Sequence, residues 1–451
     1  MISKKIFILL VFYIMITGYV YSENFDTQTI IRPIETMSSF NLLGAGARPQ
    51  GMGWTYIALS DDQTGVVWNP SGPTILEHSE FAITGFVNHR IEKPSFKNEQ
   101  FFIDDQTVSY MDLKYIGFLQ PVSILGYDGY LSVYYHNQLD FNRKWNFIKT
   151  YQEEKTNYQS NIDYQSEGVL SSLGIASGIR LAKNVSIGLS LDIMDDKLTK
   201  NHWEQNNIQK SWGQITNQIS KNSFEEYYHV NDRFTFKGIQ LNTGLVWRNI
   251  NQLNLSLGLV CKTAYSADIT QHRHIFISST AYQQYTKKEL TSHMTLKMPL
   301  SYGLGLCYRF SDYWLTAVDI YRTKWNQFRL IDASGNEISP LTGLAIHDSE
   351  IRSATQVRIG TEYTGFQTDK YIVPLCFGVF YDPMPSEESP DDYWGMTFGT
   401  GFVMKNLYSL DIAYQYRFGH NVNQFILKNE QFSQDVHEHS VNLSLIIFFD
   451  K

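Results

Sequence analysis

The sequence lacks any long apolar run after its first 22 residues. A membrane-spanning helix needs about 20 consecutive, mostly apolar residues, and no such stretch follows residue 22. Proline is sparse, with 12 residues among 451, and the net charge of −8 includes no basic stripe. We therefore expect neither a helical membrane protein nor a nucleic-acid-binding protein.

Cysteine is also rare. Cys261, Cys307 and Cys376 are widely spaced and fall inside segments that read as strands. An odd, scattered set of this kind predicts small packing residues rather than a disulfide framework or a metal site. No Gly-x-Ser-x-Gly motif of a serine hydrolase is present. We expect no cofactor, no bound metal and no enzymatic activity.

Residues 1–22 have the layout of a secretory signal peptide. Lys4 and Lys5 form a positive start, residues 6–16 are apolar, and Val20 and Ser22 stand where small cleavage-site residues occur. A retained anchor helix is the alternative, but its apolar run is short for a bilayer. The signal predicts that the mature chain is exported.

Aromatic residues are abundant, at 15% of the chain, and lie in segments where apolar and polar residues alternate. In residues 407–418, for example, Leu410 and Ile412 share one face while Asp411 and Gln415 share the other. A strand that crosses lipid alternates in this way because one face meets acyl chains and the other meets the lumen. Further examples are residues 253–265 and 441–449.

Fourteen strand-like segments follow one another, and their connections alternate between short and long. Short turns on one side and long loops on the other are typical of outer-membrane barrels. We therefore predict an all-β fold, a transmembrane antiparallel β-barrel of about 14 strands over residues 79–451, with a soluble β-sandwich as the alternative. The strand centres are 80–90, 107–119, 129–139, 169–181, 185–198, 232–248, 252–266, 290–310, 313–328, 354–364, 371–382, 395–404, 406–418 and 439–449.

Residues 23–78 precede the first strand and contain no long alternating span. Their glycines permit tight turns, and their Asn, Asp and Pro residues are turn formers. The lumen of a fourteen-stranded barrel is wide enough to hold such a segment, so we predict a hatch that plugs and gates it; a periplasmic extension is the alternative. The predicted gating residues are Gly44, Gly46, Gly51, Gly53, Asp61, Asp62, Asn69, Pro70 and Ser71.

One predicted loop carries a regular apolar spacing. Ile208, Trp212, Ile215 and Ile219 recur at intervals of four, three and four residues. This spacing predicts a short amphipathic helix in an extracellular loop. Its apolar face would capture ligand, or would pack on the loop that contains Trp145.

Two other patterns have weaker meaning. The pairs His272/His274 and His437/His439 have the spacing of a metal site on a strand, but no further ligands are near them in the sequence. We interpret them as solvated loop histidines. The acidic stretch 382–392 lacks the ligand spacing of a calcium loop and predicts a solvated surface loop.

Three stretches resemble the FadL-type family of outer-membrane transporters for long-chain fatty acids and other hydrophobic compounds. The first is the hatch region, where residues 44–54 precede Asn69-Pro70-Ser71, which is similar to the Asn-Pro-Ala motif of the family's hatch. The other two, residues 298–325 and parts of 358–416, follow in the family's order. The resemblance implies a fourteen-stranded barrel, in agreement with the strand count.

The resemblance also implies a function. Extracellular loops would capture a long-chain fatty acid or an aromatic hydrocarbon, the barrel would pass it beyond the hatch, and it would leave sideways into the bilayer. The expected surroundings are outer-membrane lipid and lipopolysaccharide, and we expect a monomer in the cell outer membrane. The alternative is a FadL-like barrel that does not transport but serves as a docking or scaffold component of a secretion or surface-attachment system.

Overall fold

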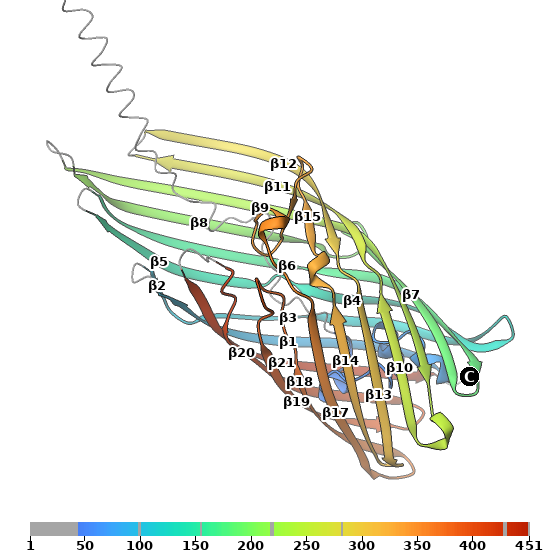
Figure 1. Cartoon of the computed structure of the whole chain (residues 1–451). Coiled ribbons are helices and arrows are strands. Elements are labelled where there is room, and N and C mark those ends of the chain that lie inside the picture. The colour runs from blue at the N-terminus through green and yellow to red at the C-terminus, as the bar shows by residue number, and fades with distance from the viewer. Residues whose placement is uncertain are drawn as a thin grey trace, which may run out of the picture.

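The computed structural model describes residues 44–97, 101–153, 156–216, 221–280, 283–426 and 431–449. Its body is one antiparallel sheet that closes on itself as a barrel (Figure 1). The ring closes where the first and last strands pair along their whole length, from Ser79 opposite Phe449 to Phe96 opposite Phe432. Ring closure pairs the first strand with the last, so their backbone groups, which lipid cannot satisfy, find partners in the sheet.

Among the described residues, fourteen strands form the ring, as the alternation predicts. The fold-class prediction is therefore confirmed. In ring order the strands are β1 (Ser79–Phe96), β3 (Gln106–Ile124), β4 (Tyr127–Asp140), β6 (Thr156–Ala182), β7 (Val185–Asp195), β9 (Lys221–Trp247), β10 (Leu255–Lys262), β13 (Ser301–Ser311), β14 (Trp314–Thr323), β17 (Ala354–Gln367), β18 (Tyr371–Tyr381), β19 (Tyr393–Met404), β20 (Tyr408–Val422) and β21 (Phe432–Phe449).

The predicted face alternation is also present. On β20, Leu410 and Ile412 are 44% and 47% exposed on the outer wall, whereas Asp411 and Gln415 are buried in the lumen. Short turns join the strands at one end of the barrel, which we call the short-turn end, for example at residues 183–184 and 405–407. Longer segments join them at the opposite, long-loop end.

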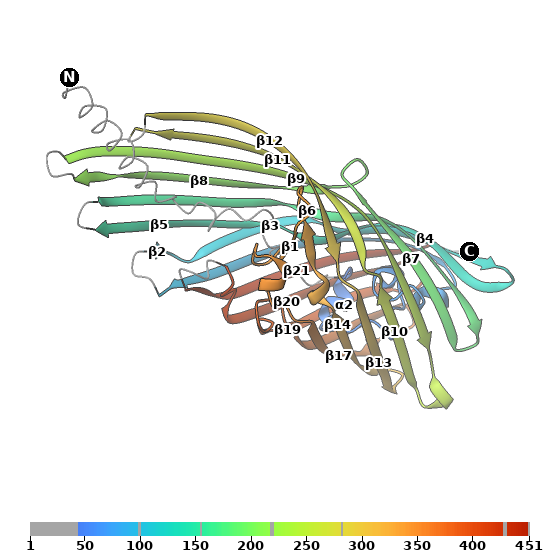
Figure 2. The same ribbon diagram turned by 45° about the horizontal axis from the view of Figure 1, so that its top comes forward.

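Several segments expected to be long loops are instead strands that lengthen the wall at the long-loop end (Figure 2). β6 and β9 are each 27 residues long, far more than the roughly 9–11 residues that cross a bilayer. Their outer halves continue into hairpins, because each finds backbone partners on both sides. The added strands are β2 (Phe101–Ile103), β5 (Arg143–Glu153), β8 (Asn201–Thr216), β11 (Tyr265–Ser279) and β12 (Gln284–Met298).

One predicted strand is wrong in its extent. Residues 290–310 form two strands, the end of β12 and the whole of β13, separated at Pro299. Proline has no N–H for a ladder, so a strand commonly ends there. β12 turns outward to pair with β11, whereas β13 enters the ring between β10 and β14.

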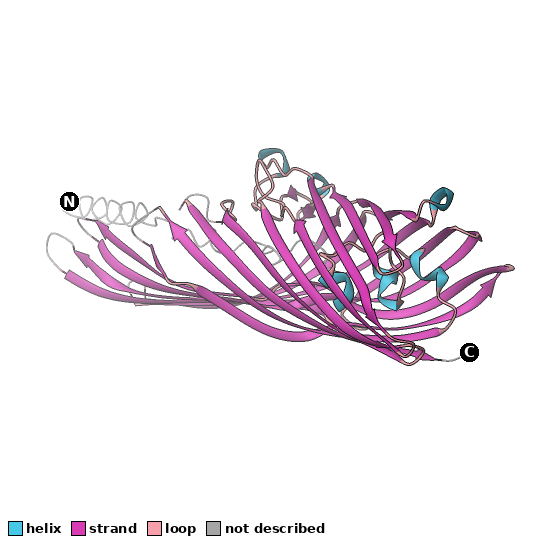
Figure 3. Cartoon of the chain, turned by 90° about the horizontal axis from the view of Figure 1, so that it is seen from below, coloured by secondary structure: helices cyan, strands magenta, loops and turns pink. Residues whose placement is uncertain are grey.

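Short helical pieces lie inside or at the rims of the barrel (Figure 3). In the segment before β1 they are α2 (Ala47–Gly51), η2 (Gln63–Val67) and η3 (Gly72–Ile75). The 3-10 helix η4 (Ile250–Gln252) lies in a short turn. A second insertion, residues 324–353, contains η5 (Trp325–Gln327), β15 (Arg329–Ile331), β16 (Glu337–Ile338) and η6 (Ile346–Asp348).

Candidate functional site

Residues 44–78, which we call the hatch segment, lie in the lumen toward the short-turn end, and barrel side chains satisfy their backbone. Asp319 on β14 accepts hydrogen bonds from the backbone N–H groups of Tyr56 and Ile57, at 2.8 and 3.0 Å. Thr397 on β19 accepts another from Gly53, at 2.9 Å. A loop that carries this many buried backbone groups needs such partners. The wall thus holds the hatch segment by directed bonds as well as by packing.

Arg48 is the main charged anchor of the hatch segment. Its guanidinium binds Glu362 of β17 through two hydrogen bonds of 2.6 and 3.0 Å. The same group donates to Asp61 at 2.6 Å and to the Tyr56 hydroxyl at 2.9 Å. A two-pronged arginine–carboxylate pair of this kind is directional as well as strong. It fixes α2 against the wall at β17.

The two neighbouring carboxylates of the hatch segment behave differently. Burial acts to raise the pKa of Asp61, but the Arg48 guanidinium outweighs burial and holds that pKa below its usual range. Burial raises the pKa of Asp62, which accepts a hydrogen bond from the Tyr56 hydroxyl at 2.5 Å and caps η2 through Gly65. Asp61 therefore serves as the counterion of Arg48, and Asp62 as a cap.

Asn69 joins the hatch segment to itself and to the wall. Its Nδ2 donates to the carbonyl oxygens of Ile57 at 2.8 Å and of Leu245 on β9 at 3.2 Å. Its Oδ1 accepts from the backbone N–H and the hydroxyl of Ser71, at 3.1 and 2.7 Å. Pro70 offers its carbonyl to the Tyr130 hydroxyl of β4 at 2.5 Å. The Asn-Pro-Ser motif is therefore a structural clamp.

The wall receives the hatch segment on a belt of inward-facing glycines. A methyl group added at Gly244 would lie 1.9 Å from Asn69 Oδ1, and one at Gly360 would lie 2.0 Å from the Met52 carbonyl oxygen. Only a residue without a side chain allows the two backbones to approach so closely. The belt, which the sequence analysis missed, comprises Gly178, Gly188, Gly244, Gly258, Gly305, Gly360, Gly378 and Gly399.

The predicted hatch glycines contribute on the other side of this contact. Gly51 packs on Gly399, and Gly44 lies against the Trp68 ring. Gly46 and Gly53 have φ angles of +96° and +63°, which favour glycine. All nine predicted gating residues thus lie in one docked segment, and whether they gate passage stays a prediction.

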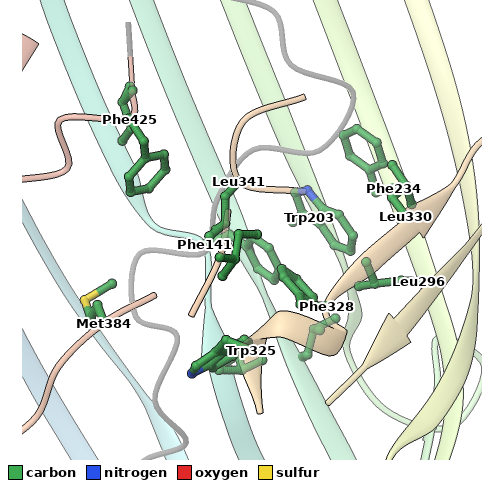
Figure 4. Packing of buried hydrophobic residues seen from close by; sticks show 14 of the residues in the cluster. Phe141, Trp203, Phe234, Leu296, Trp325, Phe328, Leu330, Leu341, Met384 and Phe425 are labelled. Carbon is green, nitrogen blue, oxygen red and sulfur yellow. The ribbon is translucent and has the colours of Figure 1, made fainter. Parts of the chain in front are cut away.

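Toward the long-loop end, the lumen is filled by a large apolar cluster (Figure 4). Trp203 of β8 stacks between Phe141 and Phe234, at ring distances of 4.4 and 4.7 Å. The insertion 324–353 adds Trp325, Phe328 and Leu330 to this cluster. Apolar side chains that converge from the wall and from the insertion offer an apolar molecule a path that excludes water.

A small chamber separates this cluster from the hatch segment. Its volume is about 50 Å³, smaller than the ~150 Å³ apolar cavity that accommodates benzene. Trp68 and Ile57 form its hatch side, and Met298 and Trp325 its other side. Passage of even a single-ring solute therefore requires the chamber to widen. Its polar lining includes His136, Gln138, Gln240, Lys262 and Arg358.

The wall beside the chamber is interrupted between β3 and β4. The ladder between these strands begins at Tyr115 opposite His136 and continues only toward the short turn. Farther toward the long-loop end, β4 has a bulge at Gln138 and stays paired with β6 rather than with β3. On β3, Lys114 has no partner in the register with β1. In the pairings of the described residues, 106–114 of β3 therefore have a partner on one side only. Bulges of this kind open or re-aim a wall.

Polar side chains occupy this β3–β4 gap. Asn137 donates to Asp112 at 3.4 Å, and farther out Gln106 and the backbone of Asn146 exchange two hydrogen bonds of 2.8 and 3.3 Å. Lys114 is 5% exposed, and its ammonium lies 5.3 Å from the centre of the Phe86 ring. The gap is thus bridged by side chains and lacks a backbone ladder.

The predicted capture helix is wrong. Residues 201–216, which include Ile208, Trp212 and Ile215, form strand β8 between β6 and β9, and Ile219 lies outside the described residues. Ladder bonds to neighbours on both sides override the helical spacing of the apolar residues. Trp212 is 44% exposed, whereas Trp145 belongs to the apolar cluster. The predicted contact between a helix and the Trp145 loop is therefore absent from this part of the structure.

The histidine and acidic patterns also differ from expectation. His272 and His274 lie on β11, and His437 and His439 lie on β21, so none of them is a loop residue. The acidic stretch is partly folded inward: Asp382 pairs with Arg417 at 3.0 Å, and Asp391 accepts a hydrogen bond from the backbone N–H of Asn423 at 2.6 Å. No group of three or more possible metal ligands comes together among the described residues.

The three cysteines lie within β10, β13 and β18 and are free. Asp319, Glu362 and the glycine belt are the hatch partners that sequence reasoning missed. The sequence contains a weak sign of the glycine belt. Several of its glycines lie at the centres of alternating segments, on the polar face that points into the lumen. The signal peptide predicted for residues 1–22 and the hatch residues 23–43 lie outside the described residues.

A closed fourteen-stranded barrel with an apolar cluster in its lumen and a seated N-terminal hatch is the structure of an outer-membrane channel. Residues 40–444 match the family described as outer membrane protein transport protein (OMPP1/FadL/TodX). The chain belongs to this family. No curated protein matches the sequence.

Solved structures share the fold at low sequence identity. A Pseudomonas aeruginosa FadL homologue aligns with a TM-score of 0.60 and 12% identity, over 92% of this chain and 100% of its own. The Pseudomonas putida toluene transporter TodX aligns at 0.56 and 14%, over 90% and 98%. The monoaromatic hydrocarbon channel CymD aligns at 0.55 and 15%, over 92% and 100%.

Family membership establishes the class of function. The protein is a channel for hydrophobic compounds in the outer membrane, and members of this family are not enzymes. The long-loop end accordingly faces the cell exterior, and the short-turn end faces the periplasm.

Proposed function

We propose that this channel takes up long-chain fatty acids or aromatic hydrocarbons at its extracellular end, passes them along the apolar cluster to the chamber, and releases them sideways through the β3–β4 gap. The hatch segment blocks the straight route to the periplasm. The single observation that carries the proposal is the position of the chamber, which touches His136, Gln138 and Leu139 where β4 leaves β3. A solute in the chamber is therefore already beside the interrupted wall.

The apolar cluster supports the capture step. Burial of apolar surface contributes roughly 25 cal/mol per Å², and the cluster offers ring faces from the wall and from the insertion 324–353. The insertion is held by side-chain packing, by a short β12–β15 pairing and by bonds from residues 349–351 to Glu387. It has fewer ladder bonds than the strands of the ring, so we expect it to shift more readily than they do. Movement of Trp325 would widen the chamber from above.

The charged lining of the chamber supports a solute with a polar group at one end. Lys262 and Arg358 line the same small chamber as Met298 and Trp68. The two cations suit a carboxylate, and the two apolar side chains suit a hydrocarbon body. Solved relatives are called toluene transporters and monoaromatic hydrocarbon channels. Long-chain fatty acids and aromatic hydrocarbons are therefore the two solute classes to compare.

Uptake measurements test the solute class. Cells that express the chain should accumulate labelled oleate or labelled toluene faster than cells without it. Replacing Trp203, the stacked ring of the apolar cluster, by Ala should slow that uptake because it removes a capturing ring face. Trp212→Ala, at an exposed tryptophan of the same strand β8, serves as the matched control. If neither compound enters faster than in cells lacking the barrel, the transport proposal fails.

A cross-link across the wall tests the exit. Asp112→Cys and Asn137→Cys place thiols at the two sides of the gap, after Cys261, Cys307 and Cys376 are replaced by Ser. A short bis-methanethiosulfonate reagent, which forms a disulfide with each cysteine and releases methanesulfinate, should then stop uptake. Reduction of the two disulfides with dithiothreitol should restore it. Undiminished uptake after complete cross-linking would show that the solute leaves elsewhere.

One observation favours the alternative, a docking or scaffold barrel. β5, β6, β8, β9, β11 and β12 form a sheet that continues well beyond the barrel ring (Figure 2). Such a projecting sheet offers a platform to a protein partner. Deleting only the distal part of the β11–β12 hairpin, residues 275–288, distinguishes the two functions. It should abolish docking and leave uptake unchanged, because Ile269, Met294 and Met298 of the solute path stay in place.

A further inference from the structure

A row of histidines crosses the outer face of the wall on two neighbouring strands, β1 and β21. His89 of β1 lies directly opposite His439 of β21 in the ladder, and their rings are 6.2 Å apart. His437 follows on the same face of β21. We call His89, His437 and His439 the histidine row. Ser109 of β3 and Tyr414 and Tyr416 of β20 adjoin it on either side.

The position of the row relative to the membrane follows from the residues below it. Along the outer face of β21, apolar residues run from Phe449 to Val441, and the next outward residue is His439. A strand needs roughly 9–11 residues to cross the hydrocarbon core, and residues 439–449 have about that length. The histidine row therefore lies at the extracellular interface, where aromatic girdles and lipid head groups meet.

Hydroxyl groups orient each imidazole of the row. Nδ1 of His89 is 2.7 Å from the Ser109 hydroxyl, and Nδ1 of His439 and of His437 are each 2.7 Å from the hydroxyls of Tyr414 and Tyr416. Within the described chain, no hydrogen-bond partner is assigned to the three Nε2 atoms. The hydroxyls thus orient the rings, and the Nε2 atoms can bind a group on the outer side of the wall.

The outward carboxylate next along β21 is Asp435, which pairs with His420 at 2.7 Å and also attracts His437. Lys93 pairs with Asp105 at 3.9 Å. The row therefore shares its nearest outward carboxylate with His420. On the lumen side of the same strands, the charged groups are buried and interact with one another. These are Arg90, Glu438 and Arg417.

We propose that the histidine row binds the phosphate groups of outer-leaflet glycolipid, with protonated imidazoles donating from Nε2. Two imidazolium groups 6.2 Å apart repel each other, and a phosphate oxygen bound between them relieves that repulsion and accepts charge-assisted hydrogen bonds. The lipid is favoured over free phosphate because the row faces the head-group layer, where a tethered phosphate is present at high effective concentration. The inference depends on the outer-membrane location alone, so it stands whichever solute the channel carries.

Histidine is the side chain whose charge changes between about pH 8 and about pH 5. The comparison is therefore made between about pH 7.5 and about pH 5.5, where more of the imidazole is protonated. Phosphate stays anionic throughout this range. Lipid binding at the row should therefore increase as the medium becomes mildly acidic.

Lipid retention by the purified full-length chain tests the proposal. The barrel is placed in phosphatidylcholine bilayers that contain either bis-phosphorylated lipid A or its dephosphorylated form, and the lipid that co-purifies is measured at the two pH values. We expect at least about a threefold gain of phosphorylated lipid A at the lower pH and no gain of the dephosphorylated form.

Matched variants separate the row from the rest of the surface. The triple variant His89→Gln, His437→Gln, His439→Gln should lose the gain, since glutamine keeps a polar side chain but cannot become cationic. The pair His272→Gln and His293→Gln, exposed on β11 and β12, should retain it. Equal gain in the triple variant, or equal gain with both lipids, overturns the proposal. Complete loss of retention on adding inorganic phosphate at low millimolar concentration would assign the site to free phosphate and overturn the lipid assignment.

Discussion

Replacing Asn69 by Ala removes the clamp that closes the hatch segment. The Asn69 amide is fully buried and makes bonds to Ile57, Leu245 and Ser71. Alanine fits the same backbone, so the change removes the bonds without adding bulk. The Ile57 carbonyl and the Ser71 N–H are then left without the partners that this structure gives them.

The expected magnitude follows from these bonds. Each buried group that loses its partner costs about 1–3 kcal/mol. Two such groups inside the hatch segment, together with the weaker tie to Leu245, amount to roughly 3 kcal/mol. Because about 1.4 kcal/mol corresponds to a tenfold change in an equilibrium constant, the ratio of unseated to seated hatch should rise roughly a hundredfold.

Conductance of single barrels in planar bilayers measures this ratio. The Asn69→Ala channel should show frequent ion-conducting openings that are rare in the unmodified chain. Asn336→Ala is the matched control, because Asn336 lies in an exposed extracellular turn and bonds only within it, to Asp332. Conductance identical to that of the unmodified protein would refute the view that this clamp keeps the lumen closed.

Three further predictions concern the same contact surface. Gly188→Ala, whose methyl group would lie 2.2 Å from the Pro70 carbonyl oxygen, should lower the melting temperature, whereas Gly85→Ala, with no neighbour nearer than 4.0 Å, should not. Arg48→Met should cost about 3–5 kcal/mol in denaturant unfolding by stranding buried Glu362, and adding Glu362→Gln should recover most of it; an unchanged double variant would contradict the pairing. Because Arg48 outweighs burial and holds the pKa of Asp61 low, the stabilisation is complete above the ordinary value of about 3.9 and is lost as pH falls through the depressed pKa. The difference in hatch tryptophan fluorescence between the unmodified chain and Asp61→Asn should therefore stay constant at mildly acidic pH and change only below about pH 3.9. Asp62, whose pKa burial raises, is present in both chains, so an earlier change in this difference would argue against the pair.

The barrel was predictable because each crossing strand must satisfy the same local condition. On β20 and β21 the outward residues are mostly apolar and the inward ones mostly polar, with exceptions such as Ala413 and Ile446. Lipid and lumen impose these opposite demands on adjacent residues. The alternation of short and long connections then gave the antiparallel up-and-down order. Strand ends at tight turns, such as residues 183–184, were equally visible.

The spacing of apolar residues gave a wrong prediction where the chain leaves the membrane. Residues 208–219 have apolar residues at helical intervals, yet residues 201–216 lie in β8 because β6 and β9 supply ladder partners on both sides. Outside lipid, neither face of a strand must be apolar, so the strict alternation that identifies a crossing strand fades. The strand predicted over 290–310 failed for a related reason, since it ran through Pro299.

The sequence by itself determined the closed barrel, the presence of a glycine-rich segment ahead of it, and the class of protein to which the chain belongs. Only the tertiary structure decided which wall residues receive that segment. Asp319 and Glu362 lie more than 260 residues from the backbone and side chains they bind, and the glycine belt is contributed by eight strands. The local alternation of apolar and polar residues shows whether a residue faces lipid or the lumen. Ring closure and register, set by the whole sheet, decide which residues meet across the lumen.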